Sequence, residues 1–165
     1  MRNSVRVRVA TAVLVASLTP LAVSAQALGA QRSPGGGVAR GSIVVTAFRS
    51  TTEATAPDGT KFEDNIITQT YTGDVMGHGP LISAEILRPN GDATFVGSEF
   101  IACRLAGRNG TLLLTDVGTV RGAVVRGTWK IVGGLGGLAG ISGRGSFVAN
   151  LGKGATYVLR FHFPA

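Results

Sequence analysis

The stretch that decides the fold runs from Trp129 to Phe147 and reads Trp-Lys-Ile-Val-Gly-Gly-Leu-Gly-Gly-Leu-Ala-Gly-Ile-Ser-Gly-Arg-Gly-Ser-Phe. A strand pattern enters it, a glycine-dense connection follows, and a second strand pattern leaves it through Arg144–Phe147. Because glycine has no side chain, the backbone can turn sharply here and pack closely at the end of a sheet. We therefore expect two strands joined by a compact turn, onto which the rest of the chain closes.

Part of this stretch, Gly134–Ala139, also fits the dinucleotide-binding pattern G-x-G-x-x-A. That pattern binds a pyrophosphate only where the turn opens a helix. Two further glycines, Gly140 and Gly143, follow at once, and each costs about 1 kcal/mol in a helix interior. No acidic residue lies about 20 positions downstream to bind a ribose. The sequence therefore predicts no cofactor.

The first 25 residues have the pattern of a secretory signal peptide. Met1–Val9 is basic, Ala10–Val23 is largely apolar, and Val23-Ser24-Ala25 resembles a cleavage site. The apolar run is shorter than the roughly 20 residues that a membrane-spanning helix needs. We expect a secreted or periplasmic protein with no stable membrane insertion after signal removal, a flexible leader over residues 26–40 and a folded domain over residues 41–165.

Charge and cysteine content exclude two classes of protein. The full chain has a formal net charge of +7. The predicted signal would remove Arg2, Arg6 and Arg8, and the remaining chain has no dense Lys/Arg cluster with interleaved aromatic residues. We therefore predict no nucleic-acid partner. The single cysteine, Cys103, excludes an internal disulfide, so packing must supply the stability.

Runs rich in Val, Ile, Thr and aromatic residues predict strands. They are Gly41–Thr52, Phe62–Met76, Leu81–Arg88, Ala93–Leu105, Thr111–Val120, Ala123–Val132, Arg144–Leu151 and Ala155–Phe163. Asn90-Gly91 and Asn109-Gly110 suit hairpin tips, and Met76–Pro80 is predicted as a loop. Short links imply antiparallel neighbours. We predict an all-β fold, an up-and-down barrel of about eight strands with no long helix apart from the signal peptide, whose interior has room for side chains or one small ligand.

Four motifs in order resemble a bacterial family, domain of unknown function 3224. They are Tyr71–Gly77, Gly97–Phe100, Leu105–Thr111 and Gly127–Phe147, and the resemblance covers about Gly41–Phe163. The family's fold is similar to the allene oxide cyclase barrel, which also resembles plant dirigent proteins. The resemblance implies a barrel with a lined interior. It does not imply cyclase activity, because one fold hosts many functions, and it carries over no catalytic residue.

Alternation along the strands assigns side chains to the barrel interior. In the run Ala93–Leu105 the odd positions are the more apolar, so they should point inward. The same rule turns one side of the neighbouring runs inward. The resulting candidates for lining a ligand are Phe95, Glu99, Ile101, Cys103, Trp129, Tyr157 and Phe161.

Glu99 is the one candidate that departs from apolar packing. A buried carboxylate must be paired or carry a raised pKa. It is either a functional group, a structural residue that accepts hydrogen bonds from neighbouring strands, or a residue that faces outward at a bulge. Cys103 fits a small buried apolar residue, since no His or Lys can be placed beside it as a base. His78 and His162 lack a third ligand at useful spacing, so no metal site is predicted.

Three functional interpretations remain open. The first is an exported β-barrel protein, not an enzyme by default, whose interior could hold a small apolar ligand. The second is an isomerase or cyclase-type enzyme that acts on an apolar substrate with Glu99 as its weak catalytic candidate. The third is an interaction module that assembles through its outer face as dirigent-type barrels do, so an oligomer is compatible with the sequence.

Overall fold

The computed structural model describes residues 35–164, and within them it contains eight strands and no helix. The strands are β1 (Gly36–Thr55), β2 (Lys61–Gly73), β3 (Val75–Leu87), β4 (Ala93–Leu105), β5 (Arg108–Arg121), β6 (Val124–Gly136), β7 (Ser142–Asn150) and β8 (Gly154–His162). With no helix in 35–164, this part of the chain offers no candidate for a helical membrane span. The predicted signal peptide lies outside the described residues. The prediction of an all-β fold with eight antiparallel strands is confirmed.

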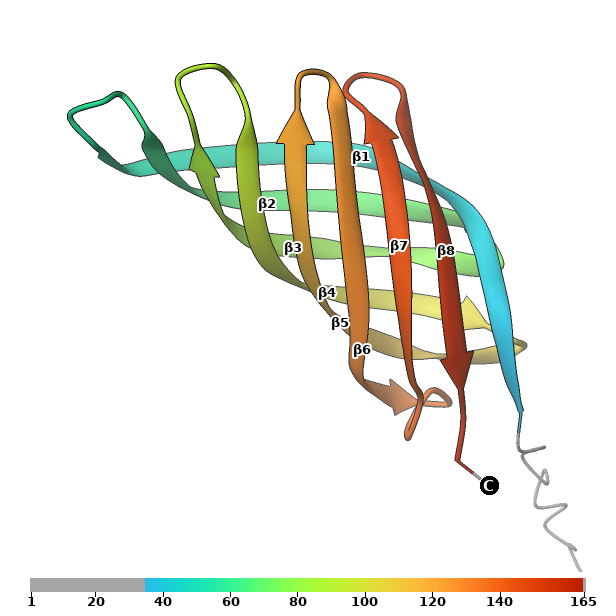
Figure 1. Cartoon of the computed structure of the whole chain (residues 1–165). Coiled ribbons are helices and arrows are strands. Elements are labelled where there is room, and N and C mark those ends of the chain that lie inside the picture. Colours follow the sequence, from blue (N-terminus) through green and yellow to red (C-terminus); the bar gives the residue numbers. More distant parts are fainter. Residues whose placement is uncertain (1–34, 165) are drawn as a thin grey trace, which may run out of the picture. The chain divides into compact units, whose positions relative to one another are not determined.

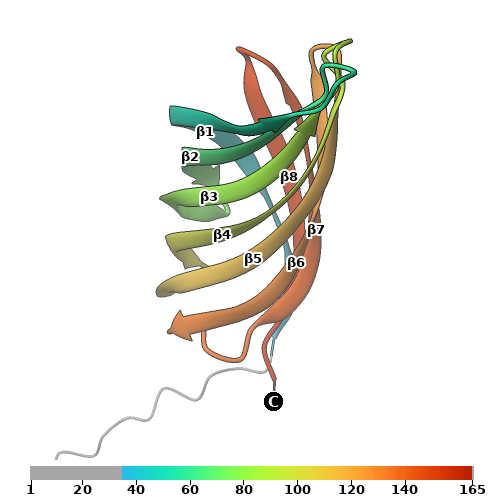
Figure 2. The same ribbon diagram turned by 90° about the vertical axis from the view of Figure 1, so that its left-hand side faces the viewer.

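Each strand pairs antiparallel with the next, and β1 also pairs with β8, so the sheet closes on itself (Figures 1 and 2). The turns after β1, β3, β5 and β7 gather at one end, at the top of Figure 1, which we call the hairpin end. The opposite end, which we call the packed end, holds the turns after β2, β4 and β6, together with the start of β1 and the end of β8.

Closure of the ring begins earlier in the chain than predicted. Residues 36–40, assigned above to the flexible leader, belong to β1 and pair with Val158–His162 of β8. Their glycines and mixed polarity carry no periodicity, and the pairing partner lies more than a hundred residues away. The leader boundary at residue 40 is therefore wrong, and residues 26–34 lie outside the described residues.

Two turns also differ from their predicted positions. Met76–Pro80 is not a loop but part of β3, because Gly77 and Gly79 lie so close to the β4 backbone that a Cβ at either position would overlap it. The hairpin between β4 and β5 turns at Ala106-Gly107, with φ of 50° and 75°, and not at Asn109-Gly110. Asn109 instead pairs with Arg104 inside the ladder.

The packed end is filled by apolar side chains. The glycine-dense connection between β6 and β7 inserts Leu138 and Ile141, which are 0% and 3% exposed. They join a core that includes Val75, Ile101, Leu105, Leu112 and Leu159. Arg40 N–H donates to Asp74 Oδ2 at 2.8 Å, which ties β1 to the turn after β2. This end of the barrel is therefore closed by its own side chains.

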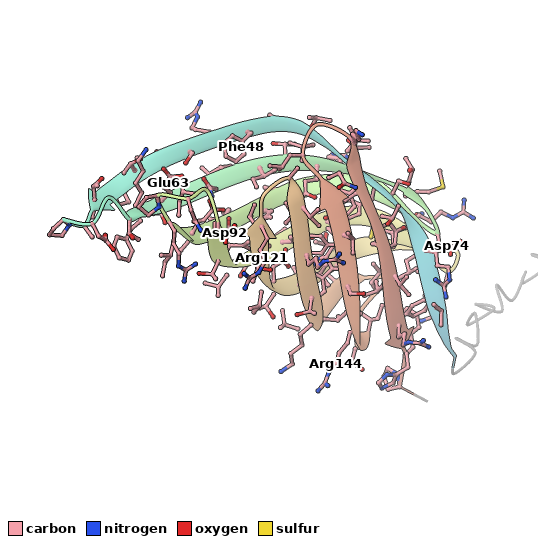
Figure 3. All side chains as sticks on the ribbon, turned by 45° about the horizontal axis from the view of Figure 1, so that its top comes forward. Phe48, Glu63, Asp74, Asp92, Arg121 and Arg144 are labelled. Atoms are coloured by element: carbon pink, nitrogen blue, oxygen red, sulfur yellow. The ribbon has the colours of Figure 1, made fainter. Side chains whose placement is uncertain are left out.

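The hairpin end is more open. β1 pairs with β8 only as far as Ile43, so its second half, from Val44 to Thr55, pairs only with β2. Phe48 in this half is 63% exposed. In Figure 3, Phe48, Asp92 and Arg121 lie toward one end of the barrel and Asp74 toward the other. The structure therefore combines a filled end with an end where the wall is incomplete.

Candidate ligand-binding site

A cavity of about 780 Å³ lies inside the hairpin end of the barrel. Most of its wall is apolar and comes from several strands and from the turn between β7 and β8; it includes Ile43, Phe48, Leu81, Phe95, Trp129 and Phe147. Apart from the exposed Asn150 and Lys153 at the turn after β7, its polar lining comes from inward positions of β2, β3 and β4: Asn65, Gln69, Ser83, Glu85 and Glu99. Among these polar residues, Gln69 and Glu99 lie farthest from the hairpin turns, so they are the innermost hydrogen-bonding groups of the cavity, at the level where the apolar Leu81 pairs with Glu99.

Strand alternation and register bring the acidic groups together. Glu99 of β4 lies opposite Leu81 of β3 and Leu114 of β5. Asp116 of β5 lies opposite Gly97, two residues before Glu99, and on its other side it faces Trp129 of β6. Glu99 and Asp116 are therefore diagonal neighbours on the inner face, a relation that brings side chains within reach of each other.

Glu99 is 2% exposed and accepts two hydrogen bonds from β2. Gln69 Nε2 donates to Oε1 at 3.3 Å, and the Tyr71 hydroxyl donates to Oε2 at 2.6 Å. Burial, followed by the negative charge of Asp116, raises the pKa of Glu99 well above its ordinary value, although the bonds from Tyr71 and Gln69 act in the opposite direction. Glu99 therefore holds its proton far more firmly than an exposed glutamate does.

Asp116 is 1% exposed, and burial raises its pKa to about 6. Glu99 and Trp129 lie within hydrogen-bonding reach of Asp116 and oppose the effect of burial on its pKa, although neither contact has good hydrogen-bond geometry. Within residues 35–164, Asn65 Oδ1 has no hydrogen-bond partner. Leaving a buried polar atom unpaired costs about 1–3 kcal/mol. The cavity wall thus contains a buried acceptor without a donor, Asn65 Oδ1.

Aromatic rings form a continuous band beside these polar groups. The Trp129 ring centroid lies 5.1 Å from that of Phe147, 5.9 Å from Tyr157 and 6.3 Å from Tyr71. Phe95 extends the band, 6.4 Å from Phe147. A Cβ on the neighbouring Gly118 would overlap the Phe95 ring. Because Gly118 has no side chain, the Phe95 ring has room on the inner face.

The seven lining candidates divide between the two ends of the barrel. Phe95, Glu99 and Trp129 line the cavity, whereas Ile101, Cys103, Tyr157 and Phe161 do not. These four belong to the core or pack against it.

Two of these residues, Tyr157 and Cys103, have surroundings that fit a structural role. The Tyr157 hydroxyl accepts a bond from Val75 N–H at 3.0 Å and donates to Thr72 O at 3.2 Å. Burial raises the pKa of Cys103 to about 11, so its thiol stays protonated at neutral pH. Neither group faces the cavity.

Sequence reasoning missed several groups of the site. They are Asn65, Gln69, Tyr71, Ser83 and Asp116, all of which are buried. Asp116 shares its face with Leu112 and Leu114, so the alternation that placed Glu99 would also have placed Asp116. Gln69 and Tyr71 share a face of β2 in the same way. In the described part of the chain, no group of three or more His, Cys, Asp and Glu side chains could hold a metal ion.

Comparison with known proteins supports the family resemblance. The family described as "Protein of unknown function (DUF3224)" matches residues 39–161. A solved structure from Shewanella oneidensis MR-1, titled as a protein with unknown function from the DUF3224 family, has a TM-score of 0.67 and 20% identity. The similarity covers 79% of this chain and 99% of that one, and it shows a shared fold.

No curated protein matches the sequence. The similarity to the allene oxide cyclase barrel stays a prediction. With a match that spans most of the chain and a family member of the same fold, the chain belongs to the DUF3224 family of proteins of unknown function.

Proposed function

We propose that this protein binds a small, mainly apolar ligand inside the hairpin end of its barrel. The observation that supports this most is that one cavity has both an apolar aromatic wall and an innermost group of hydrogen-bonding side chains. Ligand sites usually combine these two features, because apolar burial supplies affinity and a few polar groups fix orientation.

The size and access of the cavity fit this function. A volume of about 780 Å³ falls within the roughly 300–1,000 Å³ typical of small-molecule sites. Access comes from the hairpin end, where the second half of β1 has no partner strand on its β8 side. The packed end offers no comparable route, because Leu138 and Ile141 fill it.

Titration with N-phenyl-1-naphthylamine, an uncharged apolar fluorophore at neutral pH, tests the proposal. We expect a saturable rise in its fluorescence with the wild-type protein. Ala149→Phe places a ring in the cavity lining and should weaken binding at least tenfold. Ala102→Phe, on the exposed outer face of β4, is the matched control and should leave binding unchanged. Absence of saturation, or equal binding by both variants, would overturn the proposal.

Catalysis is a second candidate function for the same site. Glu99 keeps a proton, while Asp116 beside it ionises more readily, and such unequal carboxyl pairs serve as acid and base in enzymes. An isomerase or cyclase-type reaction of an apolar substrate would use Glu99 as the proton donor. Incubation of an apolar cell extract with wild type or with Glu99→Gln, followed by mass spectrometry, separates the functions. A compound transformed only by wild type supports catalysis, and an unchanged extract supports binding alone.

We also infer export, from the basic and apolar pattern of residues 1–25. Intact-mass measurement of the exported protein should show loss of about 25–30 residues. Recovery of the full chain in a membrane fraction would contradict it.

A further inference from the structure

The cavity lining is acidic, in contrast to the whole chain. The formal net charge of the chain is +7. Yet in the described part of the chain the cavity is lined by two glutamates, Glu85 and Glu99, and by one basic residue, Lys153, which lies exposed in the turn after β7. Asp116 adds a third acidic group directly behind Glu99. A bound cation would favour the ionised form of these carboxyl groups and be attracted to them, whereas a bound anion would oppose their ionisation.

The buried polar atoms without a hydrogen-bond partner also favour a ligand that donates hydrogen bonds. Asn65 Oδ1 is a buried acceptor without a partner in residues 35–164, and the carboxylate oxygens of Asp116 have no hydrogen bond of good geometry, although Glu99 and Trp129 lie within reach. Asn65 lines the cavity itself. An incoming group with several N–H donors would satisfy acceptors that the protein leaves unpaired, which an incoming acceptor cannot do.

The aromatic rings in the cavity wall also favour a bound cation. Trp129 and Phe95 line the same cavity as Glu99, and Tyr71 donates its hydroxyl to the Glu99 carboxyl group. The faces of aromatic rings attract cations, most strongly for tryptophan and most strongly where water is excluded. The same rings bury the hydrocarbon part of a ligand.

Together these observations identify the chemical class of the ligand. Resting on the ligand-binding function proposed above, we propose that the ligand is an apolar amine, with its primary or secondary ammonium group held by Glu99 and its hydrocarbon part along Trp129, Phe95 and Leu81. A quaternary ammonium has no N–H donor to offer the Glu99 carboxyl group. A fatty acid or phosphate ester would bring a negative charge to the acidic groups.

Three ligands of equal chain length test this choice: octylamine, 1-octanol and octanoate. At pH 7 an alkylamine is protonated, since its pKa is similar to that of lysine, about 10.4. Each is titrated against the protein loaded with N-phenyl-1-naphthylamine. We expect octylamine to displace the fluorophore at a concentration at least tenfold lower than octanol, and octanoate to be the weakest of the three.

Two variants assign the preference to the acidic site. Glu99→Gln keeps the shape of the side chain and removes its ability to ionise beside a bound ammonium group, so octylamine should lose its advantage and fall within about threefold of octanol. Asp64→Asn removes an exposed acidic group on the outer face of β2 and should keep the full preference. The order of the three ligands on wild-type protein stands as a test even where Glu99→Gln fails to fold.

The outcomes separate the two proposals. If the fluorophore binds but octanol or octanoate displaces it as well as octylamine does, the amine assignment is overturned and the ligand-binding function stands. Full retention of the preference in Glu99→Gln also overturns the assignment. If the fluorophore does not bind to wild-type protein, both proposals fall.

Discussion

Glu99 interacts with groups from two other strands, β2 and β5, and this determines when it ionises. Its bonds come from Gln69 and Tyr71 of β2, the charge nearest to it is Asp116 of β5, and Glu85 of β3 lines the same cavity. Burial and the Asp116 charge favour the protonated carboxyl more than the two hydrogen bonds favour the carboxylate. Glu99 is thus a hydrogen-bonded carboxyl group whose surroundings favour its protonated form.

This protonation predicts how stability depends on pH. The folded pKa values of Glu99 and Asp116 lie above their ordinary values of 4.5 and 3.8, so the native state holds extra protons. The associated stability is present below the ordinary values and is lost as pH rises through the folded values. We expect the free energy of unfolding, measured with urea from pH 4 to 8, to fall with rising pH, by up to about 1.4 kcal/mol per pH unit for each proton.

Glu99→Gln should reduce this slope, because one of the two titrating groups is gone. Asp64→Asn, exposed on the outer face, should keep the wild-type slope. A wild-type profile that is flat across this range would mean that neither carboxyl holds an extra proton.

Trp129 contributes to stability as well as to the cavity wall. It is 4% exposed and contacts the rings of Tyr71, Phe147 and Tyr157. We expect Trp129→Ala to lower the free energy of unfolding by about 3–5 kcal/mol, the usual cost of truncating a buried aromatic side chain. Leu135→Ala on the same strand is the comparison. Leu135 is 57% exposed, so its truncation should cost about 0.5 kcal/mol or less. Similar costs for the two variants would place Trp129 outside the core.

At the scale of elements, the hairpin between β4 and β5 is under local strain. Ala106 has φ of 50°, the only non-glycine residue with positive φ in the described part of the chain. Such a conformation costs an L-residue with a Cβ roughly 1–2 kcal/mol. Asn tolerates it better, and Asn-Gly is a preferred pair for a two-residue hairpin turn.

Ala106→Asn should therefore raise the free energy of unfolding by about 0.5–1 kcal/mol. The measurement is urea denaturation at constant pH. Ala102→Asn, at an exposed position in the middle of β4, should bring no gain, because its backbone belongs to the strand ladder. A loss of stability in Ala106→Asn would show that the strain is relieved in some other way.

At the scale of the whole barrel, closure depends on the first residues of β1. Residues 36–40 pair with β8, and Ala39 among them is 1% exposed. A chain that begins at Gly41 loses this pairing, and at about 0.5–1.5 kcal/mol for each hydrogen bond it should be less stable by about 3 kcal/mol or more. A chain that begins at Gly35 should match the wild type in thermal denaturation. Equal melting temperatures for the two shortened chains would mean that the stability of the barrel does not depend on the pairing of residues 36–40 with β8.

The outer face bears on the interaction-module interpretation. Exposed apolar side chains lie on the outer face of β2 to β5, among them Ile66, Ile82, Val96, Phe100 and Val117. Large exposed apolar areas often mark interaction sites. Assembly stays a prediction, and sedimentation velocity over a range of protein concentrations measures it directly.

The sequence by itself determined the features that depend on local pattern. Alternation and turn residues were enough to predict eight antiparallel strands, and the same alternation placed Glu99 and Trp129 on the inner face. A strand has a period of two residues, so the side that a residue faces can be read from its nearest neighbours. The Gly-rich connection after Trp129 was likewise predicted as a turn and not as a nucleotide site.

Only the tertiary structure decided which inward residues meet. The pairing of β4 with β5 brings Asp116 beside Glu99, and the pairing of β2 with β3 places Gln69 and Tyr71 within reach of the same carboxyl group. Long-range register also determines the pairing of Gly36–Arg40 with β8. It likewise determines the division of the barrel into a filled end and an end with a cavity. These features depend on contacts between residues far apart in the chain, and the local period of a strand carries no information about its partner.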